Sequence, residues 1–331
     1  MKHRGKLPSD FLFKRVVGKL PIQGEGVLLG PSLGEDAAIL EMKEPLLAIH
    51  SDPVTGGGRL AGWLSVYVAS NDIATRGLRP KWLLVVLLFR EGVSESEISE
   101  LVDQVGTAAR EIGAVVVGGH TEITPGLPFN IVVTTAMGTG KFVLNTRDAK
   151  EGDVLILTKA AALEGTAILA TELRDLLEER GLDPRLLERA SGFIKEISVV
   201  RDAMISANTA RAMHDPTEGG LLGGVQEMAL ASGNGFIIYE DRIPLREETI
   251  AICEALGVDP LRLISSGSLL VAVSEERVGE LIDELRKEGI GASIIGRLTR
   301  RDEGMKIVRS NGVEEDVSEP VTDELWRILS A

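Results

Sequence analysis

The stretch from Leu46 to Gly58, LLAIHSDPVTGGG, sets the pattern from which the fold of this chain is predicted. Its apolar first half predicts a strand that ends near Asp52. Glycines 56–58 then break the chain before an apolar segment that predicts a helix over residues 60–76. Free backbone N–H groups at a helix N-terminus favour anions. Asp52 therefore belongs either to a binding site or to an ordinary strand-to-helix loop, where Asp is a common turn former.

Strands and helices continue to alternate along the rest of the chain. Ser94 and Glu97 form a capping-box pattern, which predicts the start of a helix with one apolar face up to Ile112. We expect strands over residues 37–42 and 46–50, joined by a turn at 43–45, and over 82–89, 114–117, 131–136, 154–158, 236–239, 269–273 and 293–295. Further helices are expected from about 164 to 179, 221 to 231 and 275 to 288. The pattern restarts near residue 150, which predicts two domains, 1–149 and 150–331, of the α/β or α+β class.

Composition excludes several classes of protein. The 331 residues are 44% hydrophobic and 26% charged, as in a globular chain. A net charge of -14 argues against nucleic acid as a partner. No apolar run reaches the roughly 18–20 residues of a membrane span, and no apolar segment follows the basic first residues, so we expect no membrane partner and a cytoplasmic location. The single cysteine, Cys253, rules out an intrachain disulfide. Scarce Gln beside abundant Glu, Lys and Arg points to a thermophile.

Two acidic groups lie in the first half of the chain besides Asp52. Residues 34–38, GEDAA, place two carboxylates directly before a predicted strand. Adjacent carboxylates repel and a divalent cation would hold both, although a solvated turn explains the same residues. Asn71 and Asp72 lie late in the first predicted helix, where they are poor helix formers. They are interpreted either as metal-site residues or as the end of that helix.

Two glycine-rich segments complete the set. Residues 117–126, VGGHTEITPG, lead from a predicted strand into two glycines whose backbone N–H groups could approach a phosphate. His120 is either catalytic or a hydrogen-bonded loop histidine. In residues 214–221, HDPTEGGL, Asp215 or Thr217 could cap the next helix. The sequence has no GxxxxGK[ST] phosphate loop, no strand-linked GxGxxG, no HExxH and no GxSxG, so acidic and small residues are what remains for a site.

In this order, the segments resemble one superfamily, the AIR synthase-like (PurM-like) proteins. It includes aminoimidazole ribonucleotide synthetase, formylglycinamidine ribonucleotide synthetase, selenophosphate synthetase, thiamine-monophosphate kinase and HypE. Residues 34–38 look like its G-D-D-A-A element, 51–52 like T-D, 71–74 like N-D-[IL]-A and 118–121 like G-G-[DEH]-[TS]. Arg147 with residues 149–154 is similar to R-x-G-A-K-x-G-D, and residues 214–221 resemble the D-P-T-R-G-G-L of HypE, the member that this chain looks most like.

The resemblance implies a two-domain PurM-like fold. Its N-terminal mixed-sheet domain would bind ATP and pair in a homodimer, and its C-terminal domain would be α/β. Members hold Mg²⁺ on the phosphates of ATP with acidic residues, and many activate an amide, carbonyl or carboxyl-like oxygen of a small-molecule substrate by phosphorylating it. Such chemistry depends on positioning and charge neutralisation, which carboxylates and metals supply.

The site residues implied by the resemblance fall into three groups. The metal ligands would be Glu35, Asp36, Asp52 and Asp72. The ATP contacts would be Gly34, Asp36, Asp52, Thr55, Asn71, Asp72, Gly118, Gly119, Thr121, Arg147, Asp215, Gly219 and Gly220. His120 and Glu122 are candidates for catalysis, either on the substrate side or in proton transfer.

The chain also departs from the members that it resembles. HypE ends in P-R-I-C, whose cysteine carries the group that is dehydrated, whereas this sequence ends in WRILSA and Cys253 follows an apolar helical pattern typical of a core. Selenophosphate synthetase needs a reactive residue near its N-terminus that is absent, and thiamine-monophosphate kinase usually has D-I-S-D-G-L at the position of residues 214–221. We expect an enzyme that uses ATP and Mg²⁺ to phosphorylate a small substrate, with or without later dehydration or ligation. A small-molecule kinase and an ATP-binding maturation partner without turnover are the alternatives.

Overall fold

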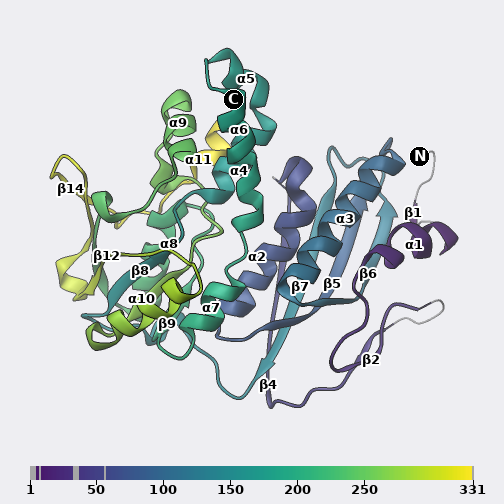
Figure 1. Ribbon diagram of the computed structural model, residues 1–331, viewed down its shortest axis with the longest axis horizontal. Coiled ribbons are helices and arrows are strands. Elements are labelled where there is room, and N and C mark those ends of the chain that lie inside the picture. The colour runs from purple at the N-terminus through teal and green to yellow at the C-terminus, as the bar shows by residue number, and fades with distance from the viewer. Residues whose placement is uncertain (1–4, 7–8, 33–36, 56, 330–331) are drawn as a thin grey trace. The chain divides into compact units, whose positions relative to one another are not determined.

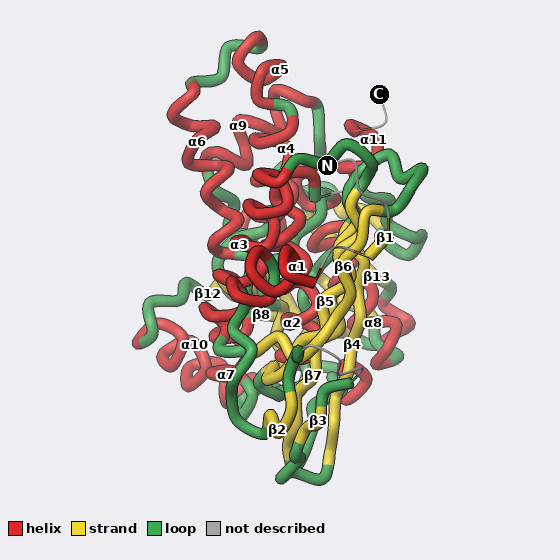
Figure 2. The backbone as a smooth tube through the Cα atoms, turned by 90° about the vertical axis from the view of Figure 1, so that its right-hand side faces the viewer, coloured by secondary structure: helices red, strands yellow, loops and turns green. Residues whose placement is uncertain are grey.

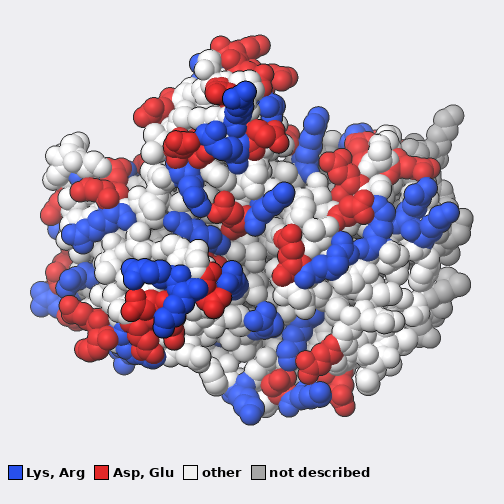
Figure 3. Space-filling model, in the orientation of Figure 1, with Lys and Arg blue, Asp and Glu red and all other residues white. Residues whose placement is uncertain are grey.

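The computed structural model describes residues 5–6, 9–32, 37–55 and 57–329 and divides the chain into two compact units (Figure 1). The first unit comprises residues 1–74 and 78–142, and the second comprises 75–77 and 143–331. Within the described residues, no helix is both long and apolar enough to cross a membrane. Lys and Arg are interspersed with Asp and Glu on the face drawn in Figure 3, as expected for a chain with 36 basic and 50 acidic residues.

The first unit is a sheet covered by helices. Its strands are β1 (Gly5–Lys6), β2 (Val27–Leu29), β3 (Ile39–Leu40), β4 (Leu46–Val54), β5 (Pro80–Phe89), β6 (Val115–Ile123) and β7 (Ile131–Gly140). Its helices are α1 (Ser9–Arg15), α2 (Ala61–Thr75) and α3 (Glu95–Ile112). The main sheet has the order β1-β6-β5-β7-β4, in which only the β5–β6 pair is parallel.

Helices α2 and α3 lie on one face of this sheet, which we call the inner face (Figures 1 and 2). Gln104 of α3 joins the two helices, because its Oε1 accepts from the N–H of Gly62 at 3.2 Å and its Nε2 donates to the carbonyl of Arg59 at 2.8 Å. The tight packing of α2 on the sheet is visible at Gly138 of β7, where an added Cβ would come within 2.6 Å of Ile73. The inner face is therefore closed over its middle.

Local signals predicted α2 and α3 of this unit, whereas α1 was not predicted. The Ser94 side chain accepts from the N–H of Glu97, and the Glu97 carboxylate accepts from the N–H of Ser94, so the predicted capping box is confirmed. The hydrogen bonds from Ser94 hold the pKa of Glu97 below its usual value. The helix then ends at Gly113, whose φ of 75° is the left-handed conformation that glycine adopts without strain. Asn71 and Asp72 do not end α2, which continues to Thr75.

Three expectations about pairing and length were wrong. The strand β3 does not pair with β4 but with β2, while β4 pairs with β7. The strand predicted over residues 114–117 continues to Ile123, because parallel pairing with β5 extends through the glycines. The long helix predicted from 164 to 179 is interrupted at Leu173, where α4 ends and α5 begins. Each error concerns long-range pairing or packing, which local patterns do not specify.

The second unit has a seven-stranded sheet in the order β14-β13-β10-β12-β8-β11-β9. Its strands are β8 (Val154–Thr158), β9 (Ala212–His214), β10 (Gly235–Tyr239), β11 (Leu270–Val273), β12 (Ala292–Thr299), β13 (Met305–Val308) and β14 (Glu314–Asp316). Its helices are α4 (Leu163–Glu172), α5 (Arg174–Glu179), α6 (Pro184–Ser191), α7 (Val200–Ser206), α8 (Gly220–Ser232), α9 (Glu247–Leu256), α10 (Val278–Lys287) and α11 (Glu324–Leu329). All residues of the central strands β8 and β11 are buried, so both faces of the sheet are covered there.

A buried carboxyl lies at the start of α4. Ala162, the residue before this helix, has a φ of 59°, which costs an L-residue about 1–2 kcal/mol. Its N–H donates to the Oγ of Ser265 at 2.8 Å, which holds the turn in place. Glu164 follows in the first turn with only 4% of its surface exposed, and its Oε2 has no hydrogen-bond partner among the described residues. Burial raises the pKa of the Glu164 carboxyl to about 7.

This carboxyl makes the stability of the protein depend on pH. Between its ordinary pKa of 4.5 and about 7, Glu164 holds its proton in the folded state and loses it in the unfolded state. The folded state then binds more protons, so stability falls as the pH rises through this window, by about 3 kcal/mol. We expect Glu164→Gln to remove this fall and to be more stable than the parent protein at pH 8 in urea denaturation.

The matched control for this prediction is Glu179→Gln, which changes an exposed glutamate of α5. It should leave the fall in stability between pH 4.5 and 7 unchanged. The same pH profile in Glu164→Gln and in the parent protein would show that Glu164 does not ionise in this range.

Candidate functional site

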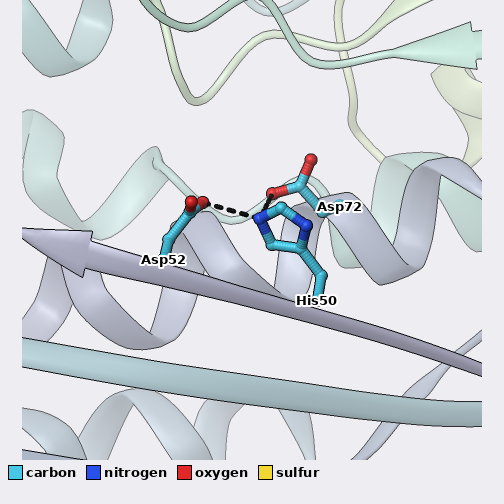
Figure 4. Close-up of side chains that lie close together, drawn as sticks. All are labelled: His50, Asp52 and Asp72. Atoms are coloured by element: carbon cyan, nitrogen blue, oxygen red, sulfur yellow. Dashed lines mark ion pairs between the residues drawn. The ribbon is translucent and has the colours of Figure 1, made fainter.

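One histidine and two aspartates come together on the inner face of the first unit (Figure 4). The Nε2 of His50 lies 3.0 Å from an oxygen of Asp52 and 3.3 Å from an oxygen of Asp72. The three side chains are between 30% and 39% exposed, so solutes can reach them. A nitrogen and two carboxylates at this spacing form a group that could hold a metal ion.

Two elements position this group. His50 and Asp52 are two residues apart in β4, so the strand alternation directs both to the same face, and the half-buried pattern at residues 48, 50, 52 and 54 shows which face it is. Asp72 reaches them from α2 (Figure 4). Its neighbour Asn71 is fully buried, which fixes that part of the helix against the rest of the unit.

The sequence predicted Asp52 and Asp72 as partners, and the structure brings them to one place. It did not predict His50. The usable signal was the i, i+2 spacing of His50 and Asp52 within an alternating strand, which puts both on one face. Gly34, Glu35 and Asp36, predicted to join the same site, lie outside the described residues. Thr55 is exposed just beyond the end of β4.

The register of the sheet connects Asp52 to the second motif. Asp52 pairs with Thr134, Thr134 with Val85, and Val85 with Gly119, so these four residues form one row across β4, β7, β5 and β6. Residues directly opposite each other in neighbouring strands share a face. Gly119 is therefore on the inner face with Asp52, three strand spacings or about 14 Å away, and Thr134 and Val85 between them are buried.

His120 belongs to the next row and so to the opposite, outer face. It pairs with Val86, which pairs with Val133, which pairs with Pro53. Its Nε2 lies 3.0 Å from the Oε2 of Glu122, and the Oε1 of Glu122 accepts from Thr124 at 2.7 Å. The hydrogen bond from Thr124, followed by that from His120, lowers the pKa of Glu122. His120 and Glu122 thus form a pair, but on the other face from Asp52.

Gly118 and Gly119 lie inside β6, not in a loop after it. A Cβ at Gly119 would come within 1.8 Å of the carbonyl oxygen of Val85, and its φ is 149°. A Cβ at Gly118 would meet the side chain of Leu84 at 2.9 Å. Gly119 is therefore required by close strand packing, whatever else its N–H contacts.

A cavity of about 250 Å³ lies between α1, α3 and the inner face near Gly119. Val85, Leu87 and Val105 contribute aliphatic walls, and polar surface makes up much of the rest. Gly118, Gly119, His120 and Thr121 complete the lining on β6. The volume is slightly below the roughly 300–1,000 Å³ of common ligand sites, so it suits one apolar group or ring better than a whole nucleotide.

The predicted residues of the second unit have different surroundings. Arg147 is exposed in a short 3₁₀ helix, and Asp215 is buried. The expectation that Asp215 or Thr217 caps the following helix was wrong, because Gly219 occupies the cap position of α8 and has no side chain to supply a cap. The N–H of Gly219 instead donates to Asp323 at 2.7 Å.

Gly219 and Gly220 both have positive φ, 83° and 66°. A Cβ at Gly220 would come within 2.6 Å of the carbonyl oxygen of Leu261, so no side chain fits there. These two glycines are thus needed for the turn into α8. Nothing in their packing tests the predicted contact with ATP.

Cys253 behaves as predicted for a core residue. It lies in α9 with 2% of its surface exposed. Burial raises the pKa of its thiol to about 12, so the reactive thiolate is suppressed at neutral pH. It is the single cysteine of the sequence, and we do not assign it a role as a carrier.

The chain is similar to known proteins in sequence and in structure. Models of the AIR synthase related protein family match residues 34–140, as its N-terminal domain, and residues 150–308, as its C-terminal domain. The carbamoyl dehydratase HypE of Rhodobacter capsulatus is 30% identical over 85% of this chain and 84% of that protein. The hydrogenase expression/formation protein HupE of Azotobacter chroococcum mcd 1 is 30% identical over 80% and 78%.

Solved structures show the same architecture. The hydrogenase maturation protein HypE in complex with ATP superposes with a TM-score of 0.78, at 23% identity and 96% coverage of both chains. The thiamine-monophosphate kinase from Stenotrophomonas maltophilia K279a superposes with a TM-score of 0.72, at 20% identity, covering 94% of this chain and 99% of that one. At such identities the likeness shows the fold, and it confirms the predicted two-domain PurM-like fold.

The strand packing at Gly119 gives a test that needs no ligand. Gly119→Ala should lower the free energy of unfolding by about 3 kcal/mol or more, because the new methyl group and the carbonyl of Val85 cannot occupy the same space. Urea denaturation without nucleotide measures this. Gly192→Ala is the control, since its φ is -65° and no atom lies within 4 Å of the added Cβ, so its stability should change little. Normal stability of Gly119→Ala would contradict the packing role.

Proposed function

Because this chain belongs to the AIR synthase-related family, we propose that it is an ATP- and Mg²⁺-dependent enzyme that phosphorylates an oxygen of a small substrate. Relatives in the family are named carbamoyl dehydratases, and one neighbouring structure contains ATP. Phosphoryl transfer needs a cation and positioning groups more than it needs a covalent catalyst. The observation that carries the proposal is the convergence of Asp52 and Asp72 on one accessible point of the first unit.

The residues present fit a divalent cation. Two carboxylates within reach of one another repel unless positive charge is shared between them, and oxygen ligands are those that Mg²⁺ prefers. Asp52 and Asp72 would hold the ion, with Asp36 and Glu35 as proposed additional ligands. The ion would neutralise charge on the phosphates of ATP. The complete burial of Asn71 would hold this part of α2, and with it Asp72, in place.

We assign the phosphates to this cluster and not to the cavity. Val85 is a wall of the cavity, and the buried Thr134 lies between Val85 and Asp52 in the sheet, so the cavity and the cluster are separate. Contacts of Gly118, Gly119 and Thr121 with ATP are thus a separate proposal from the cation site. Contacts of Thr55, Arg147, Asp215, Gly219 and Gly220 with ATP also stay predictions.

His120 and Glu122 are proposed to act on the substrate side. The lowered pKa of Glu122 keeps it ionised, so it accepts a hydrogen bond from the Nε2 of His120 and fixes the ring. In that tautomer the Nδ1 of His120 can accept a proton. Because this pair and Asp52 lie on opposite faces of the sheet, we give the pair no part in binding the cation.

We propose a homodimer through the outer face of the first unit. Leu47 and Ile49 of β4 are 44% and 61% exposed there, and Leu28, Ile39 and Met42 nearby in sequence are more than half exposed. Exposed apolar side chains of this size are available for an interface. The mass in solution tests it against the 35.5 kDa of one chain.

The two alternative functions, a small-molecule kinase and a maturation partner, can be distinguished by the products that they release. A kinase of small molecules, for which the likeness to thiamine-monophosphate kinase is an argument from fold alone, would release a stable phosphorylated product with ADP. A maturation partner would bind ATP without turnover. Cys253 is buried, so we do not propose it as the carrier of a substrate group.

Calorimetric titration with ATP in the presence of Mg²⁺ tests the proposal. The parent protein should bind one ATP per chain, and Asp52→Asn should weaken binding by about tenfold or more, because a ligand of the cation loses its charge. Asp175→Asn, the same change at an exposed position of α5, should bind as the parent does. Absence of ATP binding by the parent protein would refute the proposed function.

A further inference from the structure

His50 is the member of the cluster that a purely acidic magnesium site does not explain. Its Nε2 atom is buried and lies between two carboxylates, at 3.0 Å from Asp52 and 3.3 Å from Asp72. Despite these distances it has no hydrogen-bond partner among the described residues. The nitrogen therefore contacts both oxygens without directing an N–H at either of them.

One ring nitrogen beside two carboxylates favours a metal ion between the three groups. A ring nitrogen carries at most one proton, which cannot serve two carboxylates in good geometry. A dication with a neutral imidazole and two carboxylates has no net charge, and the lone pair of the Nε2 nitrogen would coordinate the ion.

The distances also suit shared coordination. Two ligands at right angles around an ion, each about 2.1 Å from it, are about 3.0 Å apart. The separations of 3.0 and 3.3 Å from His50 to the two carboxylates match this value. All three ligand atoms lie within 4.8 Å of one another, so one ion could contact all of them.

A second observation next to the cluster points in the same direction. Thr134 of β7 is directly opposite Asp52 in the sheet and on the same face. Its side chain is completely buried, and its Oγ1 has no hydrogen-bond partner among the described residues. A buried hydroxyl without a partner is costly, and a water bound to a metal ion would supply one.

We propose that His50, Asp52 and Asp72 bind a first-row transition-metal dication, such as Mn²⁺, through one imidazole nitrogen and two carboxylate oxygens. Imidazole is a ligand for these ions, whereas Mg²⁺ selects oxygen and retains its waters. The inference rests on the proposed function and changes its cation, since it places a transition-metal dication at the two carboxylates where Mg²⁺ is proposed above. It assigns His50 the role of selecting that cation.

Electron paramagnetic resonance of Mn²⁺ added to the nucleotide-free protein tests this directly. The loss of the free Mn²⁺ signal gives the affinity, and electron spin-echo modulation reports a ¹⁴N nucleus bound to the ion. The protein should bind one Mn²⁺ per chain with nitrogen modulation. His50→Asn should abolish the modulation and weaken Mn²⁺ by about tenfold or more, while the Mg²⁺ affinity, measured by displacement of Mn²⁺, should change little.

His214→Asn is the matched control, because it removes a histidine of the second unit that pairs with Glu227. It should keep the nitrogen modulation, and any histidine tag must be removed before the measurement. Mn²⁺ bound without nitrogen modulation would overturn the proposal while leaving the carboxylates as a cation site. Absence of Mn²⁺ binding by the parent protein would overturn it as well. Neither outcome depends on ATP. Failure of the protein to bind ATP would therefore contradict the proposed function and not the role of His50.

Discussion

The register of the ladder β4–β7–β5–β6 is the constraint on which the candidate site depends. Alternate residues of a strand face opposite sides of the sheet, so a slip of one residue would move His50 and Asp52 away from Asp72. Nine pairs hold β4 against β7, from Leu46–Gly140 to Val54–Val132. The same register places Gly119 in the row of Asp52 and His120 in the row behind it. One set of backbone hydrogen bonds thus decides which motifs can act together.

Electrostatics supplies the second constraint. The first unit gathers two carboxylates at a partly exposed point, with the Nε2 of His50 close to both of them. Such an arrangement is costly without a cation, whereas charge pairs at the surface contribute little to stability. This favours a binding role for the cluster over a structural one. Gly119 and Gly220 need no binding role to explain them, because close packing at each position already leaves no space for a side chain.

Local features were predictable from the sequence and long-range features were not. Ser94 and Glu97 specify the start of α3 through contacts three residues apart, and the structure contains them. The ordered acidic and glycine motifs led to the fold, which the structural likeness confirms. The length of β6 depends on its pairing with β5, and the local sequence near Gly118 does not predict that the strand continues. His50 was not predicted because its proximity to Asp72 depends on how α2 packs on the sheet, and the sequence around His50 does not specify this packing.

In the proposed function, this chain uses Asp52 and Asp72 to transfer a phosphoryl group from ATP. The most direct measurement is the rate of ADP formation with Mg²⁺ and with Mn²⁺ in the presence of fractionated cell metabolites, for the parent protein and for Asp52→Asn. We predict that at least one fraction stimulates turnover by the parent protein and that Asp52→Asn abolishes this stimulation. Stimulated turnover that persists in Asp52→Asn, or ATP binding without turnover in any fraction, would contradict it.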